Sequence, residues 1–438
     1  MSFGNRCTGW NSACRFAAVA LLFVFLFLLS IKSHATIGVG FQLLIGNPSG
    51  ATTNSTNFNN YLIQREVQSI GYSNQRRQPI WASWNYITSD TGSSGRSDAF
   101  AADTNLPPGF YQVQATDYSG SGYDRGHMCP SGDRTDTLPH NVQTFLMNNM
   151  IPQAPDNNQG IWANLETYSR AIAASNEVLV ICGPEGFGSA VTASSGQIPI
   201  ASNVWKIIVA VPLGSGSTLS RITNATRVIT VNIPNIQGIR SNPWQNYLTS
   251  VNQLQTNTGF TFFTALNPNL AAVLRAKVDG SPACGITNLN PASGLVNSSV
   301  IIRGTNLTGT TTVAFNGVNA TFTLNSANQI TAIVPNTATT GPISVIAAGG
   351  LATSTNNFTV TAPVVATPPT LIIGLVANNV VLTWPTNAST FSLQQNADLT
   401  MTNWTAYGGT ITTSGTNKTT TISNVVGRLN FRLIAPAP

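Results

Sequence analysis

The sequence predicts an α+β domain followed by two small all-β, sandwich-like modules, and three observations support this. The chain has 438 residues, too many for one ordinary domain, and 42% of them are hydrophobic, enough to build cores. Helix-type and strand-type patterns mix over residues 36–283, as in α+β or α/β domains. After Cys284 the texture changes to short β-type runs interrupted by Gly, Asn and Pro, which is typical of small β-sandwiches.

The first 35 residues have the pattern of a secretory signal peptide. Two arginines precede an apolar run at residues 16–31, and Ser33 and Ala35 supply the small residues of a cleavage site. An uncleaved membrane anchor is the alternative, but the run is shorter than the roughly 20 residues of a full span. We expect residues 1–35 to be a signal for bacterial export, giving a secreted, extracellular or cell-surface protein.

The predicted α+β domain covers residues 36–283. "GIWANLETYSRAIAAS" (160–175) places its apolar residues near helical spacing and predicts a helix. "EVLVICGP" (177–184) and "VWKIIVAVPLG" (204–214) are apolar, β-branched and closed by Gly or Pro, which predicts buried strands. Cys129, Cys182 and Cys284 would remain after export, so one disulfide is possible, and their spacing matches no zinc site.

The two β modules are expected at residues 284–361 and 371–438, joined by a Pro-rich linker at 362–370 that should be extended. From Gly285 onward there is no His, Glu or Cys. The charged side chains in that part are Arg303, Asp398, Lys418, Arg428 and Arg432. Acid–base or metal chemistry is therefore not expected in the modules.

A cluster of charge stands out in "GYDRGHMCPSGDR" (122–134), because charged residues make up only 8% of the chain. His127 lies in it, and a histidine is well suited to move a proton near neutral pH. Arg125 is two residues away, and a guanidinium can hold a phosphate through two parallel hydrogen bonds. The formal net charge of +6 is a weak further pointer to an anionic partner.

Several motifs in order resemble the DNA/RNA non-specific endonuclease family, secreted sugar-non-specific nucleases with a ββα-metal site. They are "RRQPIWASWNYI" (76–87), "GRSDAF" (95–100), "DRGHMCPSGDR" (124–134) and "TFLMNNMIPQAPDNNQGIWANLE" (144–166). The resemblance extends over most of residues 60–190 and implies a central sheet flanked by helices. It also implies that a β-hairpin presents His127 against the helical region that presents Asn158. Residues 285–361 resemble the IPT/TIG immunoglobulin-like domains through "ITNLNPASG", "VIIRGTNL" and "VAFNGVNA".

The nuclease resemblance implies a role for each matching residue. His127 matches the general base that activates water, and Asn158 matches the single protein ligand of a divalent cation, usually Mg²⁺, with Mn²⁺ or another divalent ion possible. Glu166 matches the acid that holds water on that metal. Asn149 matches an asparagine that orients the site. The remaining matches are the arginines placed around the phosphate: Arg125, Arg170 and Arg96.

The residue types suit phosphodiester hydrolysis, which needs an activated water and neutralisation of extra negative charge. Mg²⁺ keeps several waters, so one amide ligand is sufficient. Glu166 lies eight residues after Asn158, which on one helix gives roughly the same face. Asn157 is the alternative ligand by position, and either asparagine could instead cap the helix.

Structural or solvent-exposed roles are expected for the other polar residues in and near these motifs, with one possible exception at Arg76 and Arg77. His140 is expected to be an exposed loop histidine, and Asp133 and Arg134 could pair with each other. Arg170 has the alternative of an ion pair with Glu166. Asp124 is expected to support the histidine loop. Arg76 and Arg77 could add to a phosphate-binding surface, although adjacent arginines are commonly only solvated.

The sequence therefore predicts a secreted, metal-dependent endonuclease that hydrolyses DNA and RNA, with no small-molecule cofactor. The β modules are expected to bind a cell-surface, carbohydrate or protein partner. Two alternatives remain: a surface or matrix binding protein with an inactive nuclease fold, and a phosphodiesterase of the same fold with a narrower substrate.

Overall fold

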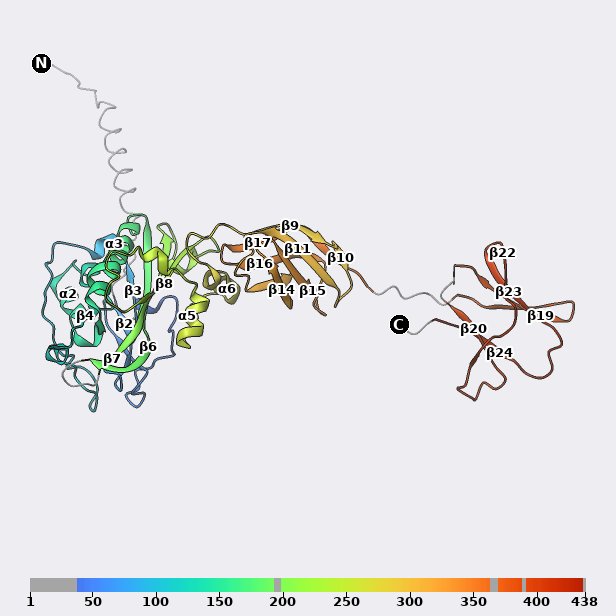
Figure 1. Ribbon diagram of the computed structural model, residues 1–438, viewed down its shortest axis with the longest axis horizontal. Helices are drawn as coiled ribbons and strands as arrows, with labels where there is room; N and C mark the ends of the chain where they lie inside the picture. Colours follow the sequence, from blue (N-terminus) through green and yellow to red (C-terminus); the bar gives the residue numbers. More distant parts are fainter. Residues whose placement is uncertain (1–37, 193–197, 363–368, 388–390, 436–438) are drawn as a thin grey trace, which may run out of the picture. The chain divides into compact units, whose positions relative to one another are not determined.

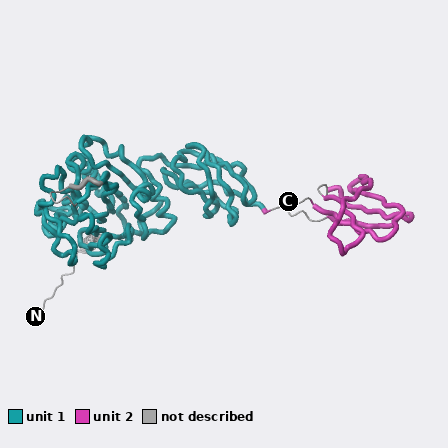
Figure 2. Tube along the Cα trace, turned by 60° about the horizontal axis from the view of Figure 1, so that its bottom comes forward, with its two compact units in different colours: residues 1–361 teal, residues 362–438 magenta. Residues whose placement is uncertain are grey.

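The computed structural model describes residues 38–192, 198–362, 369–387 and 391–435, with side chains described outside 189–197. The chain divides into two compact units, residues 1–361 and 362–438 (Figure 2). The predicted signal peptide lies outside the described residues. Over the ranges described, none of the helices combines the length and apolarity that crossing a membrane would require.

A six-stranded antiparallel sheet forms the centre of the first domain (Figure 1). Its order is β1-β2-β3-β6-β7-β8, and all nine residues of β3 are buried. The strands are β1 (Tyr61–Gln64), β2 (Ser69–Ser73), β3 (Gln78–Tyr86), β6 (Asn176–Thr192), β7 (Ile198–Pro212) and β8 (Arg227–Pro234). Since both faces of the central strands are buried, β6 and β7 carry apolar runs, whereas β3 also buries the polar side chains of Gln78, Ser83 and Asn85.

Helices cover both faces of this sheet. On one face, η6 (Asn157–Trp162) and α3 (Ala163–Ile172) pack Ile161, Trp162 and Leu165 against Trp84 and other sheet residues. On the other face lie α5 (Val251–Thr258) and α6 (Pro268–Ala276). The predicted arrangement of a central sheet flanked by helices is confirmed. The remaining helical segments are η1 (Phe41–Leu43), η2 (Thr88–Asp90), η3 (Ala115–Tyr118), η4 (Ser131–Asp133), η5 (Met147–Asn149), α4 (Thr218–Arg221) and η7 (Trp244–Tyr247).

A separate two-stranded ribbon, β4 (Asp124–His127) and β5 (Met150–Gln153), presents the DRGH motif. The strands are antiparallel, with His127 opposite Met150. No tight turn joins them as in the expected hairpin, because the connection contains α2 (Leu138–Thr144). The chain then runs directly from β5 into η6, so strand, strand and helix form one unit.

The first β module is a two-sheet sandwich with sheets β10-β17-β16-β12-β13 and β14-β15-β11-β9. Its core includes Val300, Phe315 and Phe358. The strands are β9 (Gly285–Asn290), β10 (Ser293–Gly294), β11 (Ser299–Thr305), β12 (Thr312–Phe315), β13 (Val318–Asn319), β14 (Phe322–Ser326), β15 (Gln329–Ile333), β16 (Gly341–Ala347) and β17 (Gly350–Val360).

The second β module has its own small core around Leu382, Trp384 and Leu393. Its sheets have the orders β18-β19-β23-β22 and β21-β20-β24. The strands are β18 (Ile372–Val376), β19 (Asn379–Pro385), β20 (Ser392–Asn396), β21 (Thr405–Ala406), β22 (Thr412–Ser414), β23 (Asn417–Ile422) and β24 (Asn430–Ile434). Both modules are all-β, as predicted.

Candidate active site

His127 ends strand β4 in a largely buried position, 9% exposed. Its ring lies edge-on to Phe100 and Phe145, with centroids 5.6 and 4.8 Å away. Its Nε2 is buried and has no hydrogen-bond partner among the described residues. Burial, together with the positive charges of Arg96 and Arg125, lowers the pKa of His127 to about 3. The imidazole is therefore neutral near pH 7, with a nitrogen available to accept a proton.

Asn149 holds the backbone that follows His127. Its Oδ1 accepts a hydrogen bond from the Cys129 amide at 3.0 Å. Its Nδ2 donates to the carbonyl oxygens of Cys129 at 2.9 Å and Thr144 at 2.8 Å. The side chain is fully buried, and its three hydrogen bonds join the segment after β4 to the residue that ends α2.

Asp124 fixes the orientation of Asn158. The Asp124 carboxylate accepts hydrogen bonds from Asn158 Nδ2 at 2.9 Å and from Gln159 Nε2 at 2.8 Å. Because the Asn158 nitrogen is engaged, its Oδ1 is left with no hydrogen bond among the residues that the structure describes. Asn158 is half-buried, so this oxygen is accessible to a ligand.

The neighbouring Asn157 is in a different situation. It is fully buried, its Oδ1 accepts from Gln153 Nε2 at 2.6 Å, and its Nδ2 donates to the Pro234 carbonyl at 2.7 Å. Both polar ends of Asn157 are thus occupied, whereas Asn158 Oδ1 accepts no hydrogen bond from any residue that the structure describes. Neither asparagine caps the helix through its side chain.

The helix predicted at residues 160–175 is preceded by, and partly replaced by, a π-helical turn. Residues 157–162 form a π-helical turn before α3 begins at Ala163. Gly160 lies in this turn, where a Cβ would lie 2.6 Å from the Cα and carbonyl oxygen of Arg240. The close approach of the Arg240 backbone is possible only at a glycine, and π turns of this kind are frequent at functional sites.

Glu166 extends from α3 and is paired with a lysine that the sequence analysis did not single out. Its Oε1 lies 3.7 Å from Nζ of Lys206, and the two side chains are 14% and 1% exposed. Burial raises the pKa of the Glu166 carboxyl, and the Lys206 charge opposes this shift. The Lys206 ammonium also lies over the rings of Trp162 at 4.1 Å and Trp84 at 5.7 Å. The position of Lys206 inside the apolar run "VWKIIVAV", which was predicted to be a buried strand, could have indicated that it needs a buried acidic partner.

Arg170 pairs with Asp133, and this corrects two expectations. Its Nη1 lies 3.0 Å from Asp133 Oδ1, while Asp133 Oδ2 accepts from Trp84 Nε1 at 2.9 Å. Arg170 therefore forms its ion pair with Asp133 and not with Glu166. Asp133 does not pair through its carboxylate with Arg134, because the Arg134 guanidinium points to other acceptors.

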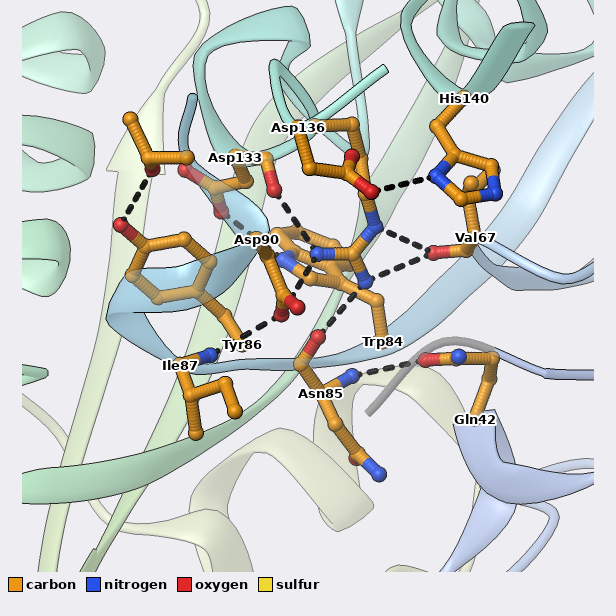
Figure 3. A network of polar contacts seen from close by, with 12 residues as sticks. Gln42, Val67, Trp84, Asn85, Tyr86, Ile87, Asp90, Asp133, Asp136 and His140 are labelled. Carbon is orange, nitrogen blue, oxygen red and sulfur yellow. Dashed lines mark hydrogen bonds and ion pairs between the residues drawn. The ribbon is translucent and has the colours of Figure 1, made fainter. Parts of the chain in front are cut away.

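Arg134 is fully buried at the centre of a polar network. Figure 3 labels its partners Val67, Asn85, Asp90 and Asp133. Its guanidinium donates to the carbonyl oxygens of Val67, Asn85 and Asp133, and it forms an ion pair with Asp90 at 3.4 Å. This network fixes the loop after β4 to the sheet. It is structural because all of these groups are buried and mutually satisfied.

His140 is not the exposed loop histidine that was expected. It lies on α2 with its side chain 20% exposed, bonded through Nδ1 to Asp136 at 2.7 Å. Its Nε2 lies 3.5 Å from Glu66. The acidic residues that hold it come from two segments, so spacing alone could not reveal the contact.

Arg125 and Arg96 lie on the aromatic rings that flank His127. The Arg125 guanidinium is 3.9 Å from the Phe100 centroid, and that of Arg96 is 4.8 Å from the Phe145 centroid. Arg96 is also paired with Asp98 at 2.6 Å and bonds Ser131 at 3.3 Å. The Arg125 guanidinium has neither an ion pair nor a hydrogen bond in the described part of the chain, which leaves it available to an anion.

The donor set fits a hard cation that retains most of its waters. Asn158 Oδ1 is an uncommitted neutral oxygen, and Glu166 is an acid on the same helical segment. The described residues contain no group of three or more His, Cys, Asp or Glu side chains placed to bind a metal. Cys129, Cys182 and Cys284 are all free thiols, the first two buried, so the possible disulfide is not formed.

The comparisons with known proteins agree with this geometry. A sequence model of the DNA/RNA non-specific endonucleases matches residues 45–269, and one of the IPT/TIG domain matches 285–361. A nuclease of Nostoc sp. is 41% identical over 242 residues, which are 55% of this chain and 87% of the relative. Nuclease C1 of Cunninghamella echinulata is 30% identical, covering 47% of this chain and 83% of the relative. Human mitochondrial nuclease EXOG is 31% identical over 155 residues, 32% of this chain and 42% of that protein. The chain thus belongs to the DNA/RNA non-specific endonuclease family of hydrolytic, metal-dependent nucleases, with an IPT/TIG domain after the nuclease domain.

Proposed function

We propose that this protein is a secreted endonuclease that hydrolyses phosphodiester bonds of both DNA and RNA, with His127 as general base. The observation that supports this best is the state of His127. Its Nε2 is buried and unpartnered, and its pKa of about 3 keeps the ring neutral. A neutral, unpartnered imidazole beside two arginines suits an anionic substrate whose attacking water must lose a proton.

The residues around His127 would bind the phosphate and the metal ion. Arg125, stacked on Phe100, and Arg96, stacked on Phe145, would hold the phosphate next to His127. Asn158, oriented by Asp124, would bind Mg²⁺ or a similar divalent ion, and Glu166 would hold a water of that ion. When bound, the ion neutralises charge on the phosphate and on the leaving oxygen. The Asp133–Arg170 pair keeps a further guanidinium beside Glu166.

Asn149 would act by position, since its three hydrogen bonds fix the chain at the end of β4. Export through residues 1–35, which would place the enzyme outside the cell or on its surface, is part of the proposal. We also propose that the β modules bind a surface, carbohydrate or protein partner. Contacts to phosphate give affinity without base selectivity, which agrees with a non-specific enzyme.

The test combines substrate scope with one pair of matched variants. Purified protein is incubated with supercoiled plasmid and with RNA, in Mg²⁺ or in EDTA. Wild type should degrade both substrates only with metal. Asn158→Ala should need roughly ten to a hundred times more Mg²⁺ for half-maximal rate. Asn164→Ala is the control, because Asn164 is exposed on the neighbouring turn of α3. Wild type without activity would favour an inactive binding protein, and cleavage of one substrate alone would favour the narrower phosphodiesterase.

A further inference from the structure

The cationic side chains of residues 38–283 fall into two groups. Most are paired with an acid or donate to backbone carbonyl groups. Three guanidinium groups in the described part of this range have neither an ion pair nor a hydrogen bond: Arg125, Arg76 and Arg77. Arg125 lies beside His127 and is available to an anion. Arg76 and Arg77 are therefore candidates for further anion-binding groups.

Arg76 and Arg77 are built in the same way as Arg125. The Arg76 guanidinium lies 4.2 Å from the Phe187 ring centroid, and that of Arg77 lies 3.8 Å from the Tyr111 centroid. A guanidinium on a ring face loses rotational freedom but keeps its N–H edges free for an anion. Arg77 also has a φ of 55°, an unusual backbone conformation for a residue with a side chain. The turn between β2 and β3 thus presents two stiffened, unneutralised cations.

This turn is continuous with the active site through aromatic packing. Tyr111 and Phe100 pack against the same small core, which includes Met150. Met150 pairs with His127 across the ribbon, and Phe100 contacts the His127 ring. The Arg77–Tyr111 pair and the Arg125–Phe100 pair therefore both border this one cluster. Over the described residues neither Arg76 nor Arg77 forms an ion pair with an acid, and the Asp117 carboxylate accepts its hydrogen bonds from the Tyr111 hydroxyl and the Gln114 amide.

Arg76 adds a second feature. It lines a hollow of about 700 Å³ whose walls include the amide and hydroxyl side chains of Asn59, Asn60 and Ser73. These side chains also hydrogen-bond one another and nearby groups, which holds the wall in place, and each amide nitrogen keeps a second N–H that can reach a phosphate or sugar oxygen. Burial without a compensating acid lowers the pKa of Arg76.

We infer that Arg76 and Arg77 form an accessory contact for the nucleic-acid backbone, which binds phosphates away from the scissile bond. This rests on the proposed function and extends it from the single phosphate at His127 to a longer stretch of substrate. The occupant is a nucleic-acid backbone because the surface offers stiff guanidinium edges and sugar-compatible polar groups. Affinity for the substrate should then depend on its length, because only a longer nucleic acid reaches both His127 and the turn.

The test compares Arg76→Ala/Arg77→Ala with Arg303→Ala/Arg428→Ala, a control that removes two exposed arginines from the β modules. Binding of a labelled 30-base-pair duplex is measured by fluorescence anisotropy in EDTA over a series of salt concentrations. The first variant should bind roughly tenfold more weakly. The slope of log affinity against log salt should fall by about 1.8, since each phosphate contact contributes about 0.9. Turnover of bis(p-nitrophenyl) phosphate with Mg²⁺, a diester too small to reach the turn, should be unchanged.

Duplex binding and salt slope equal to those of the control would overturn the inference. An equal loss on the small diester would also overturn it, because the change would then act on the catalytic centre. Failure of the proposed function would be visible separately, as a wild type that cleaves neither the duplex nor the small diester.

Discussion

Replacing Lys206 by methionine should destabilise the protein by about 3 kcal/mol at neutral pH. Its ammonium lies 3.7 Å from Glu166, and at an effective dielectric constant of about 20 this attraction is about 4 to 5 kcal/mol. Removing one partner of a buried ion pair costs about 3–5 kcal/mol. Because Glu166 remains 14% exposed, water compensates part of the loss, which favours the lower end.

The pH dependence of this loss has a definite sign. Glu166 has a raised pKa in the folded state, so its contribution to stability is lost as pH rises through that pKa. Lys206 limits the loss by favouring the charged carboxylate. The difference in unfolding free energy between wild type and Lys206→Met should therefore grow from acid to neutral pH.

The assay is urea unfolding of wild type, Lys206→Met, Glu166→Gln and the double variant. The two changes should not add, because each single variant leaves one charged or polar partner buried alone. A coupling free energy of at least about 1 kcal/mol is expected for residues in direct contact. Additivity within about 0.5 kcal/mol at pH 7, or a loss that shrinks as pH rises, would refute the pairing argument.

Two further predictions follow from the site. Since the pKa of His127 falls from 6.5 to about 3 on folding, protonation favours the unfolded chain. Between pH 6 and pH 4, the unfolding free energy of wild type should therefore fall about 1.4 kcal/mol per pH unit more steeply than that of His127→Gln, and equal slopes in urea unfolding would contradict this. Asp124→Asn should raise the Mg²⁺ concentration for half-maximal plasmid cleavage roughly ten- to a hundredfold, because it disturbs the orientation of Asn158. Asp398→Asn, a change in the last module, should leave that concentration unaltered.

The large features of the fold could be predicted from the sequence because they depend on local patterns. The apolar, β-branched runs of β6 and β7, closed by Gly or Pro, favour buried strands, and residues 163–172 have helical spacing. The change after Cys284 to short β-type runs interrupted by Gly, Asn and Pro likewise predicted the two β modules. Each of these signals lies within one short segment.

The side-chain partners could not be predicted, because they depend on sheet register and on segments far apart in sequence. Lys206 on β7 meets Glu166 on α3 across 40 residues, and Asp124 reaches Asn158 across 34 residues. Asp133 had Arg134 beside it, yet the backbone directs Arg134 to Val67 and Asn85 and leaves Asp133 to Arg170. The close approach of the Arg240 backbone to Gly160, within the π turn at residues 157–162, joins segments 80 residues apart in the sequence.

The most direct test of the central claim is the single-turnover rate of plasmid nicking by His127→Ala at saturating Mg²⁺. His140→Ala is the matched control, since His140 is the other histidine of residues 36–438 and is held by Asp136 and Glu66. Loss of a general base should lower the rate at least a hundredfold in His127→Ala and not in His140→Ala. A His127→Ala rate within a fewfold of wild type would contradict the account.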